Sequence, residues 1–193
     1  MTTKSVLFNQ EPHWIESHAG LRHHLPVGVQ SWAYESGSLT QRLRGYYGPE
    51  VAVKVLLQCW KSPYLSEHRL LKIPKHEYVL TREVLLYVKG KHLILARTVI
   101  PYITVKTAKS NLSKLGSRPL GEIIFSYPKL ERMAMELSLI ALPTWKSSLL
   151  KQVPISEPIW GRRTVYSIAN KQMLVSEFFL PEVLHEFNCQ NAL

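Results

Sequence analysis

Alternating apolar and polar residues divide much of the chain into strands that come in adjacent pairs. Runs rich in β-branched and aromatic residues, bounded by turn residues or proline, are typical of hairpin strands. The predicted strands are residues 51–57, 78–87, 92–100, 162–169 and 172–180. Lys89–Gly90–Lys91 supplies the turn of the first pair, with Gly90 free to adopt a positive φ, and Asn170–Lys171 supplies the turn of the second. The pattern therefore predicts two antiparallel hairpins and one preceding strand.

Helix-start signals and apolar residues at helical spacing predict the helices. Ser38 fits an N-cap, with Gln41 reaching back in a capping box. Pro119 is suited to the first turn of a short helix, and residues 66–71 suggest another. The longest predicted helix covers residues 128–142, where one apolar stripe consists of Leu130, Met133, Ala134, Leu137 and Ala141.

The length of 193 residues fits a single domain. Residues 1–30 carry scattered His, Pro and Gly and little periodicity. We therefore expect residues 1–30 to form an N-terminal extension packed on the domain, and residues 31–193 to form the domain itself.

Each predicted hairpin carries one ionisable residue in an apolar row. The two-residue period of a strand places Arg82 with Val84 and Leu86, and Glu177 with Val175 and Phe179. A buried guanidinium without a partner is costly, so an inward-facing Arg82 is expected to meet a carboxylate.

Two interpretations of Arg82 and Glu177 remain open at this point. In one, the role is structural: the two side chains form a buried ion pair with each other, or one of them faces solvent because the strand register differs. In the other, Arg82 holds a substrate carboxylate in a pocket, and Glu177 meets a polar group at the other end and takes part in proton transfer. The backbone amide of Leu39, at the start of the helix that Ser38 caps, and amides around Leu120 would favour an anion in such a pocket.

The formal net charge of +10 favours anionic partners of any kind, a small dicarboxylate or a nucleic acid among them. No run of five or six basic residues marks a nucleic-acid-binding arm, and we interpret Arg162–Arg163 as solvated surface. Cys59 and Cys189 are far apart and have no metal-binding spacing, so we predict two isolated thiols.

The sequence gives no indication of a metal site or of a membrane segment. Four histidines lie in the N-terminal region without a carboxylate or cysteine at matching spacing, and we interpret them as solvated; they are His13, His18, His23 and His24. The chain has no apolar run of the length that a membrane helix needs and does not begin like a secretory signal peptide. We therefore expect a cytoplasmic protein without membrane insertion.

Five motifs, in order along the chain, resemble those of the chorismate pyruvate-lyase family. The resemblance covers roughly residues 32–181, and the motifs are Thr81-Arg82-Glu83-Val84-Leu85-Leu86, Ala96-Arg97-Thr98-Val99-Ile100-Pro101, Leu115-Gly116-Ser117-Arg118-Pro119-Leu120-Gly121, Trp160-Gly161-Arg162-Arg163-Thr164 and Glu177-Phe178-Phe179-Leu180-Pro181.

The resemblance implies an α+β fold with a single antiparallel β-sheet, flanking helices and a ligand enclosed beneath mobile flaps. It implies that Arg82 binds the ring carboxylate of chorismate, that the amides of Leu39 and Leu120 assist, and that Glu177 meets the 4-hydroxyl group. The implied reaction eliminates pyruvate from chorismate to give 4-hydroxybenzoate, as the first step toward ubiquinone. Aromatisation supplies the driving force, so we expect no metal and no other cofactor.

Other functions are weighed against this one. A non-catalytic domain of the same architecture could sense a small carboxylate, although Glu177 argues against it. Nucleic-acid binding rests only on the net charge, because zinc-finger spacing and a basic helix are missing from the sequence. Arg97 is expected either to assist the ligand or to pair with Glu83. We further expect a monomer whose partner is the small-molecule substrate.

Overall fold

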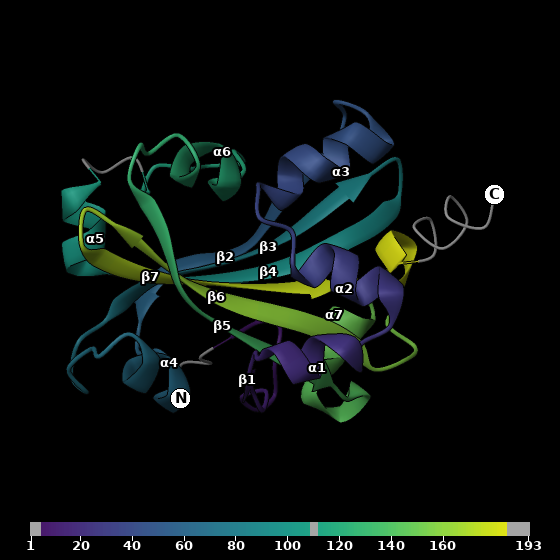
Figure 1. The fold of residues 1–193 in the computed structure, drawn as a ribbon, viewed down its shortest axis with the longest axis horizontal. Coiled ribbons are helices and arrows are strands. Elements are labelled where there is room, and N and C mark those ends of the chain that lie inside the picture. Colours follow the sequence, from purple (N-terminus) through teal and green to yellow (C-terminus); the bar gives the residue numbers. More distant parts are fainter. Residues whose placement is uncertain (1–4, 109–111, 185–193) are drawn as a thin grey trace.

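The computed structural model describes residues 5–108 and 112–184, whose strands form one seven-stranded sheet in the order β1-β5-β6-β7-β4-β3-β2 (Figure 1). Every neighbouring pair is antiparallel. The strands are β1 (Ile15–Glu16), β2 (Ala52–Lys61), β3 (Val79–Val88), β4 (Lys91–Pro101), β5 (Leu130–Ile140), β6 (Ile159–Ile168) and β7 (Lys171–Phe179). The predicted α+β class with a single antiparallel sheet is confirmed.

Both predicted hairpins are confirmed, and their turns need left-handed backbone. Lys89 and Gly90, between β3 and β4, have φ values of 45° and 80°. Ala169 and Asn170, between β6 and β7, have φ values of 48° and 62°, so the second turn lies one residue earlier than predicted. Two consecutive residues with positive φ match the right-handed twist of the strands that they join.

The helix predicted over residues 128–142 is wrong, because β5 occupies this segment. Leu, Glu, Met and Ala are good helix formers, and their spacing resembles a helical stripe. In the fold, β5 pairs with β6 from Leu130↔Ile168 to Ile140↔Ile159, and long-range strand pairing outweighs a weak local preference. A bulge between Arg132 and Ala134 also breaks the simple alternation that would have indicated a strand.

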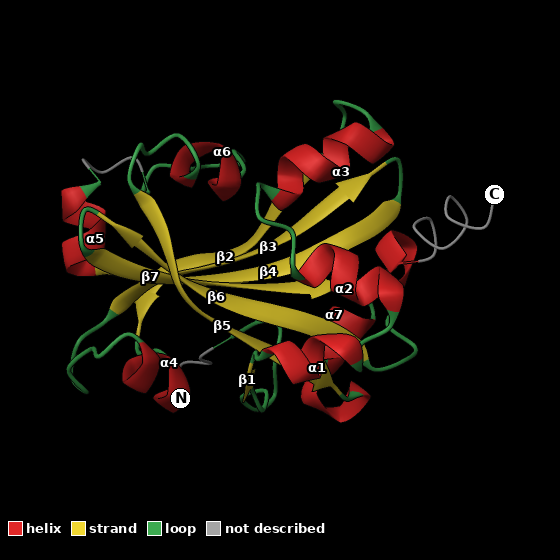
Figure 2. Ribbon diagram, viewed as in Figure 1, coloured by secondary structure: helices red, strands yellow, loops and turns green. Residues whose placement is uncertain are grey.

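Helices cover both faces of the sheet (Figure 2). They are α1 (Ala19–His23), α2 (Val27–Ala33), α3 (Leu39–Tyr47), α4 (Leu65–Leu70), α5 (Tyr102–Thr107), α6 (Leu120–Ile124), α7 (Ser147–Leu150) and the 3-10 helix η1 (Leu142–Thr144). Helices α2 and α3 pack with Val84 and Ile94 on one face, and α5 and α6 pack farther along the same face with Val175.

The N-terminal segment and α7 cover the opposite face. Leu7 and Phe8 are buried there against Trp145 and Phe178. The two faces therefore have separate apolar cores, and the residue parity along each strand decides which core a side chain enters.

Within the described part of the chain, no helix is long and apolar enough to cross a membrane.

Candidate active site

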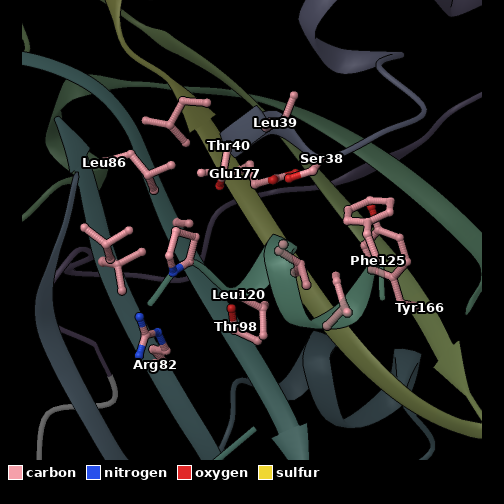
Figure 3. A pocket seen from close by; sticks show the side chains of 18 residues that line it. Ser38, Leu39, Thr40, Arg82, Leu86, Thr98, Leu120, Phe125, Tyr166 and Glu177 are labelled. Atoms are coloured by element: carbon pink, nitrogen blue, oxygen red, sulfur yellow. The ribbon is translucent and has the colours of Figure 1, made fainter. Parts of the chain in front are cut away.

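A pocket lies between the sheet and the first residues of α3 and α6 (Figure 3). Its cavity volume of about 50 Å³ exceeds the roughly 10–15 Å³ that one water molecule needs. Strands β3, β4, β6 and β7 provide the floor, and the helix starts provide the cover. Its lining is mainly apolar, with a few polar groups: Ser38, Thr40, Arg82, Thr98, Tyr166 and Glu177. An apolar cavity with few, convergent polar groups is typical of a small-molecule site.

Arg82, on β3, is 2% exposed and faces this pocket. Its Nη1 donates to Gln58 Oε1 at 2.9 Å and to the Gly116 carbonyl at 2.7 Å, and its Nη2 donates to the Arg118 carbonyl at 3.0 Å. The loop before α6 thus orients the guanidinium through neutral acceptors.

The carboxylate that a buried Arg82 is expected to meet does not come from residues 5–108 and 112–184. None of the ion pairs among these residues includes Arg82. Burial lowers the pKa of Arg82, and no neighbouring acid acts against that effect. Neutral carbonyl oxygens accept three hydrogen bonds from the guanidinium, but its positive charge has no counter-charge among the residues that the structure describes.

Glu177 lies on the same face and also lines the pocket, but it does not pair with Arg82. Its Oε2 accepts from Arg162 Nε at 2.7 Å. Arg162 is 1% exposed and lies opposite Glu177 in the β6–β7 register. The interpretation of Arg162–Arg163 as solvated surface is therefore wrong, because β6 is an interior strand with both faces covered.

The two helix starts bring backbone amides to the pocket. Leu39 is the first residue of α3, where the Ser38 side chain accepts from the Gln41 amide at 3.4 Å, and Leu120 is the first residue of α6. Both leucines line the pocket, and the role of their amides in binding an anion stays a prediction.

Helices α3 and α6 contact each other above the pocket. A Cβ atom on Gly121 would lie 2.6 Å from Ser38 Oγ, so any larger residue here would force the Ser38 hydroxyl to move. Arg44 and Glu122 form an ion pair between the same helices. The cover is thus held together by side chains from both of its parts.

The family that matches this sequence over residues 10–188 is described as "Chorismate lyase". The chain belongs to the chorismate lyase family. The match spans all five motifs from which the resemblance was inferred, as well as the pocket residues on β3, β7, α3 and α6.

Curated relatives agree with membership of the chorismate lyase family. The chain is 41% identical to a "Probable chorismate pyruvate-lyase" of Methylococcus capsulatus over 156 residues, which are 81% of this chain and 96% of the relative. A protein of the same name from Hydrogenovibrio crunogenus is 34% identical over 184 residues, which are 93% of this chain and 96% of that protein.

Solved structures show that the fold extends beyond close sequence relatives. The PhnF C-terminal domain gives a TM-score of 0.55 at 16% identity, covering 82% of this chain and 95% of that one. The effector domain of PhnF from Mycobacterium smegmatis also gives 0.55, at 12% identity, with coverage of 76% and 90%. At such low identity the likeness concerns the fold alone.

In this chorismate lyase family member, sequence reasoning missed Thr98 and Tyr166. Thr98 lies opposite Arg82 in the β3–β4 register, and Tyr166 comes from β6. Burial raises the pKa of the Tyr166 phenol, Glu177 raises it further, and Arg162 and Arg132 act in the opposite direction. Tyr166 lies on the same face of β6 as Arg162, but both residues are linked to the pocket only once the β6–β7 register is known.

Arg97 lies on the opposite face and does not line the pocket. Its Nη1 donates to Glu83 Oε1 at 2.7 Å, and its Nε donates to Glu67 Oε1 at 2.7 Å. The alternative in which Arg97 pairs with Glu83 is therefore confirmed. Glu83 also accepts from the Ser5 hydroxyl and the Val6 amide, which attaches the N-terminal segment to the sheet.

Among residues 5–108 and 112–184, no three His, Cys, Asp or Glu side chains are grouped to hold a metal ion. Cys59 is a half-buried free thiol, as predicted, and Cys189 lies outside the described residues.

Proposed function

We propose that this chain eliminates pyruvate from chorismate and leaves 4-hydroxybenzoate. The observation that carries the proposal is the Arg82 guanidinium, buried at the pocket with no carboxylate partner in the described part of the chain. A ligand carboxylate would provide the missing negative charge and form charge-assisted hydrogen bonds with the guanidinium. The names of the family and of the curated relatives support chorismate as that ligand.

The pocket has suitable groups for the two ends of the chorismate ring. Arg82 and Glu177 lie apart across the pocket in Figure 3, with apolar side chains between them. The ring carboxylate would bind Arg82 and the amides of Leu39 and Leu120, and the 4-hydroxyl group would reach Glu177. Such an arrangement orients the ring by its two polar ends and excludes water along its sides.

The proposed chemistry is an elimination that needs no net oxidation or reduction. The ether bond between the ring and the enolpyruvyl oxygen breaks, and the ring carbon that bears the hydroxyl group loses its hydrogen as a proton. The ring becomes aromatic, and the released enolpyruvate gains a proton to form pyruvate. The contribution of the protein is orientation together with electrostatic and proton-transfer assistance, with Glu177 as the general acid or base.

The test is to incubate the purified chain with chorismate and a chelator, then to measure pyruvate enzymatically and to separate the aromatic products by chromatography. Equal amounts of pyruvate and 4-hydroxybenzoate are expected. Formation of 3-hydroxybenzoate would contradict the proposed regiochemistry. Binding of 4-hydroxybenzoate without turnover would instead point to a carboxylate-sensing domain.

We further propose that the product enters ubiquinone synthesis. A strain that lacks this chain should lose ubiquinone and should regain it when 4-hydroxybenzoate is supplied in the medium. Normal ubiquinone content in the unsupplemented strain would contradict this role.

A further inference from the structure

The guanidinium of Arg162 connects Glu177 to the segment that leads into α3. Its Nε donates to Glu177 Oε2 at 2.7 Å, and its Nη1 donates to the carbonyl oxygens of Ala33 and Glu35 at 2.9 Å each. Arg162 is 1% exposed, so these bonds form away from solvent. The segment that contains Glu35 continues into Ser38, the N-cap of α3.

The other oxygen of the Glu177 carboxylate, Oε1, accepts no hydrogen bond from the residues that the structure describes, whereas Oε2 is held by Arg162. The planar guanidinium of Arg162 is itself held through Nη1 by two carbonyl oxygens, so it restrains the carboxylate that Nε binds more strongly than a flexible ammonium group would. One oxygen is therefore fixed, and the other remains available to a ligand.

We infer that Arg162 is a positioning residue for the reaction, and this inference rests on the proposed function of the pocket. Arg162 holds the Glu177 carboxyl group in one orientation, which leaves Oε1 to face the ligand hydroxyl group. Through the carbonyl oxygens of Ala33 and Glu35, it also fixes the start of α3 relative to that carboxylate. The two groups that contact opposite ends of the ligand, Glu177 and the Leu39 amide, thereby share one anchor.

Arg163 provides a matched control on the same strand. It is 5% exposed, forms an ion pair with Glu136 through Nε, and donates from Nη1 to Ser66 Oγ at 2.5 Å. Adjacent residues of a strand point to opposite faces, so Arg163 serves the face that does not form the pocket. Replacing Arg162 or Arg163 removes a similar buried ion pair, but only Arg162 is bonded to a pocket residue.

The experiment compares R162M, R162K, R163M and R163K with the wild-type chain in steady-state turnover of chorismate, and it repeats R162M and R163M in an E177Q background. Urea unfolding gives the folded fraction of each variant, and rates are expressed per folded molecule.

R162M is expected to lower kcat by about 100-fold with a smaller change in KM, because a misplaced general acid or base affects the reaction step more than binding. R162K should recover part of this loss, since it keeps the charge but not the fork geometry. R163M is expected to lower kcat by less than about threefold, the order expected of a substitution remote from the reacting groups. In the E177Q background, R162M should cause little additional loss.

Equal kcat losses per folded molecule in R162M and R163M would overturn the inference. So would an R162M loss that is as large in the E177Q background as in the wild-type background. If R162M does not fold, the test is the comparison of kcat per folded molecule between R162K and R163K. The inference requires that R162K lowers kcat and that R163K does not. A wild-type chain that releases no pyruvate from chorismate would refute the proposed function itself, which is a separate outcome.

Discussion

Arg82 and Arg97 lie on neighbouring strands of one sheet, are equally buried at 2% exposure, and have opposite electrostatic surroundings. Arg97 contacts two carboxylates, those of Glu67 and Glu83, and has the ring of Tyr64 at 4.7 Å. Within residues 5–108 and 112–184, Arg82 donates only to neutral oxygens. Burial alone therefore does not separate these two arginines, whereas the presence or lack of a carboxylate partner among the described residues does.

The strongest test of this comparison is R82M. Loss of the guanidinium should lower kcat/KM for chorismate by about 1,000-fold, because the ligand carboxylate would be desolvated without a charged partner. The free energy of unfolding should change by less than about 2 kcal/mol, since the charge lost was itself uncompensated. Turnover and urea unfolding measure the two effects, and near-normal turnover would refute the assignment of Arg82.

R97M should show the reverse pattern. It leaves Glu67 and Glu83 buried without their cation, and the free energy of unfolding should fall by about 3–5 kcal/mol. The molecules that remain folded should turn over chorismate at near the wild-type rate, because Arg97 does not reach the pocket. Turnover per folded molecule, measured at low temperature, checks this expectation. A stable R97M protein without activity would contradict the division between the two faces.

G121A tests the cover of the pocket rather than its floor. The added Cβ would displace Ser38 Oγ, which caps α3. Loss of this cap costs about 1 kcal/mol, and the start of α3 covers the pocket. The affinity for 4-hydroxybenzoate should therefore fall roughly five- to tenfold. G45A is the matched control, because a Cβ on Gly45 in α3 meets nothing within 4 Å. It should stabilise the protein by up to about 1 kcal/mol and leave the affinity unchanged. Titration calorimetry measures the affinity of both variants for 4-hydroxybenzoate. Equal affinities would show that the close approach of Gly121 to Ser38 does not contribute to ligand binding.

At alkaline pH we expect a smaller effect, on the free energy of unfolding, from Tyr64 on the face of the sheet opposite the pocket. Burial raises the pKa of the Tyr64 phenol to about 12, whereas a tyrosine in the unfolded chain has a pKa of about 10. Between these values the unfolded state binds fewer protons than the folded state, so stability falls as the pH rises. Y64F should show a shallower decline in the urea midpoint between pH about 10 and 12 than the wild-type chain. Y64F removes this one phenol and no other ionisable group, so identical slopes would contradict the raised pKa.

Much of the fold could be predicted because local signals agree with it. The turns at Gly90 and Asn170 and the alternation around them define both hairpins. The segment that became β5 could not be predicted, because its residues favour a helix locally and only pairing with β6 makes it a strand.

The site could be predicted in part for a similar reason. Arg82 and Glu177 are charged residues in apolar rows, which is visible in the sequence alone. Their partners are not visible there. The carbonyl oxygens of Gly116 and Arg118 come from a distant loop, and Arg162 is identified only once the β6–β7 register is known.

The ion pair between Arg44 and Glu122 has a consequence for how long a ligand stays bound. It joins the two parts of the cover, and its side chains are 36% and 33% exposed. At physiological ionic strength charges are screened over about 8 Å, and such exposed pairs contribute at most about 1 kcal/mol. The residence time of the product would then vary with the salt concentration of the medium, while the chemistry beneath the cover would not.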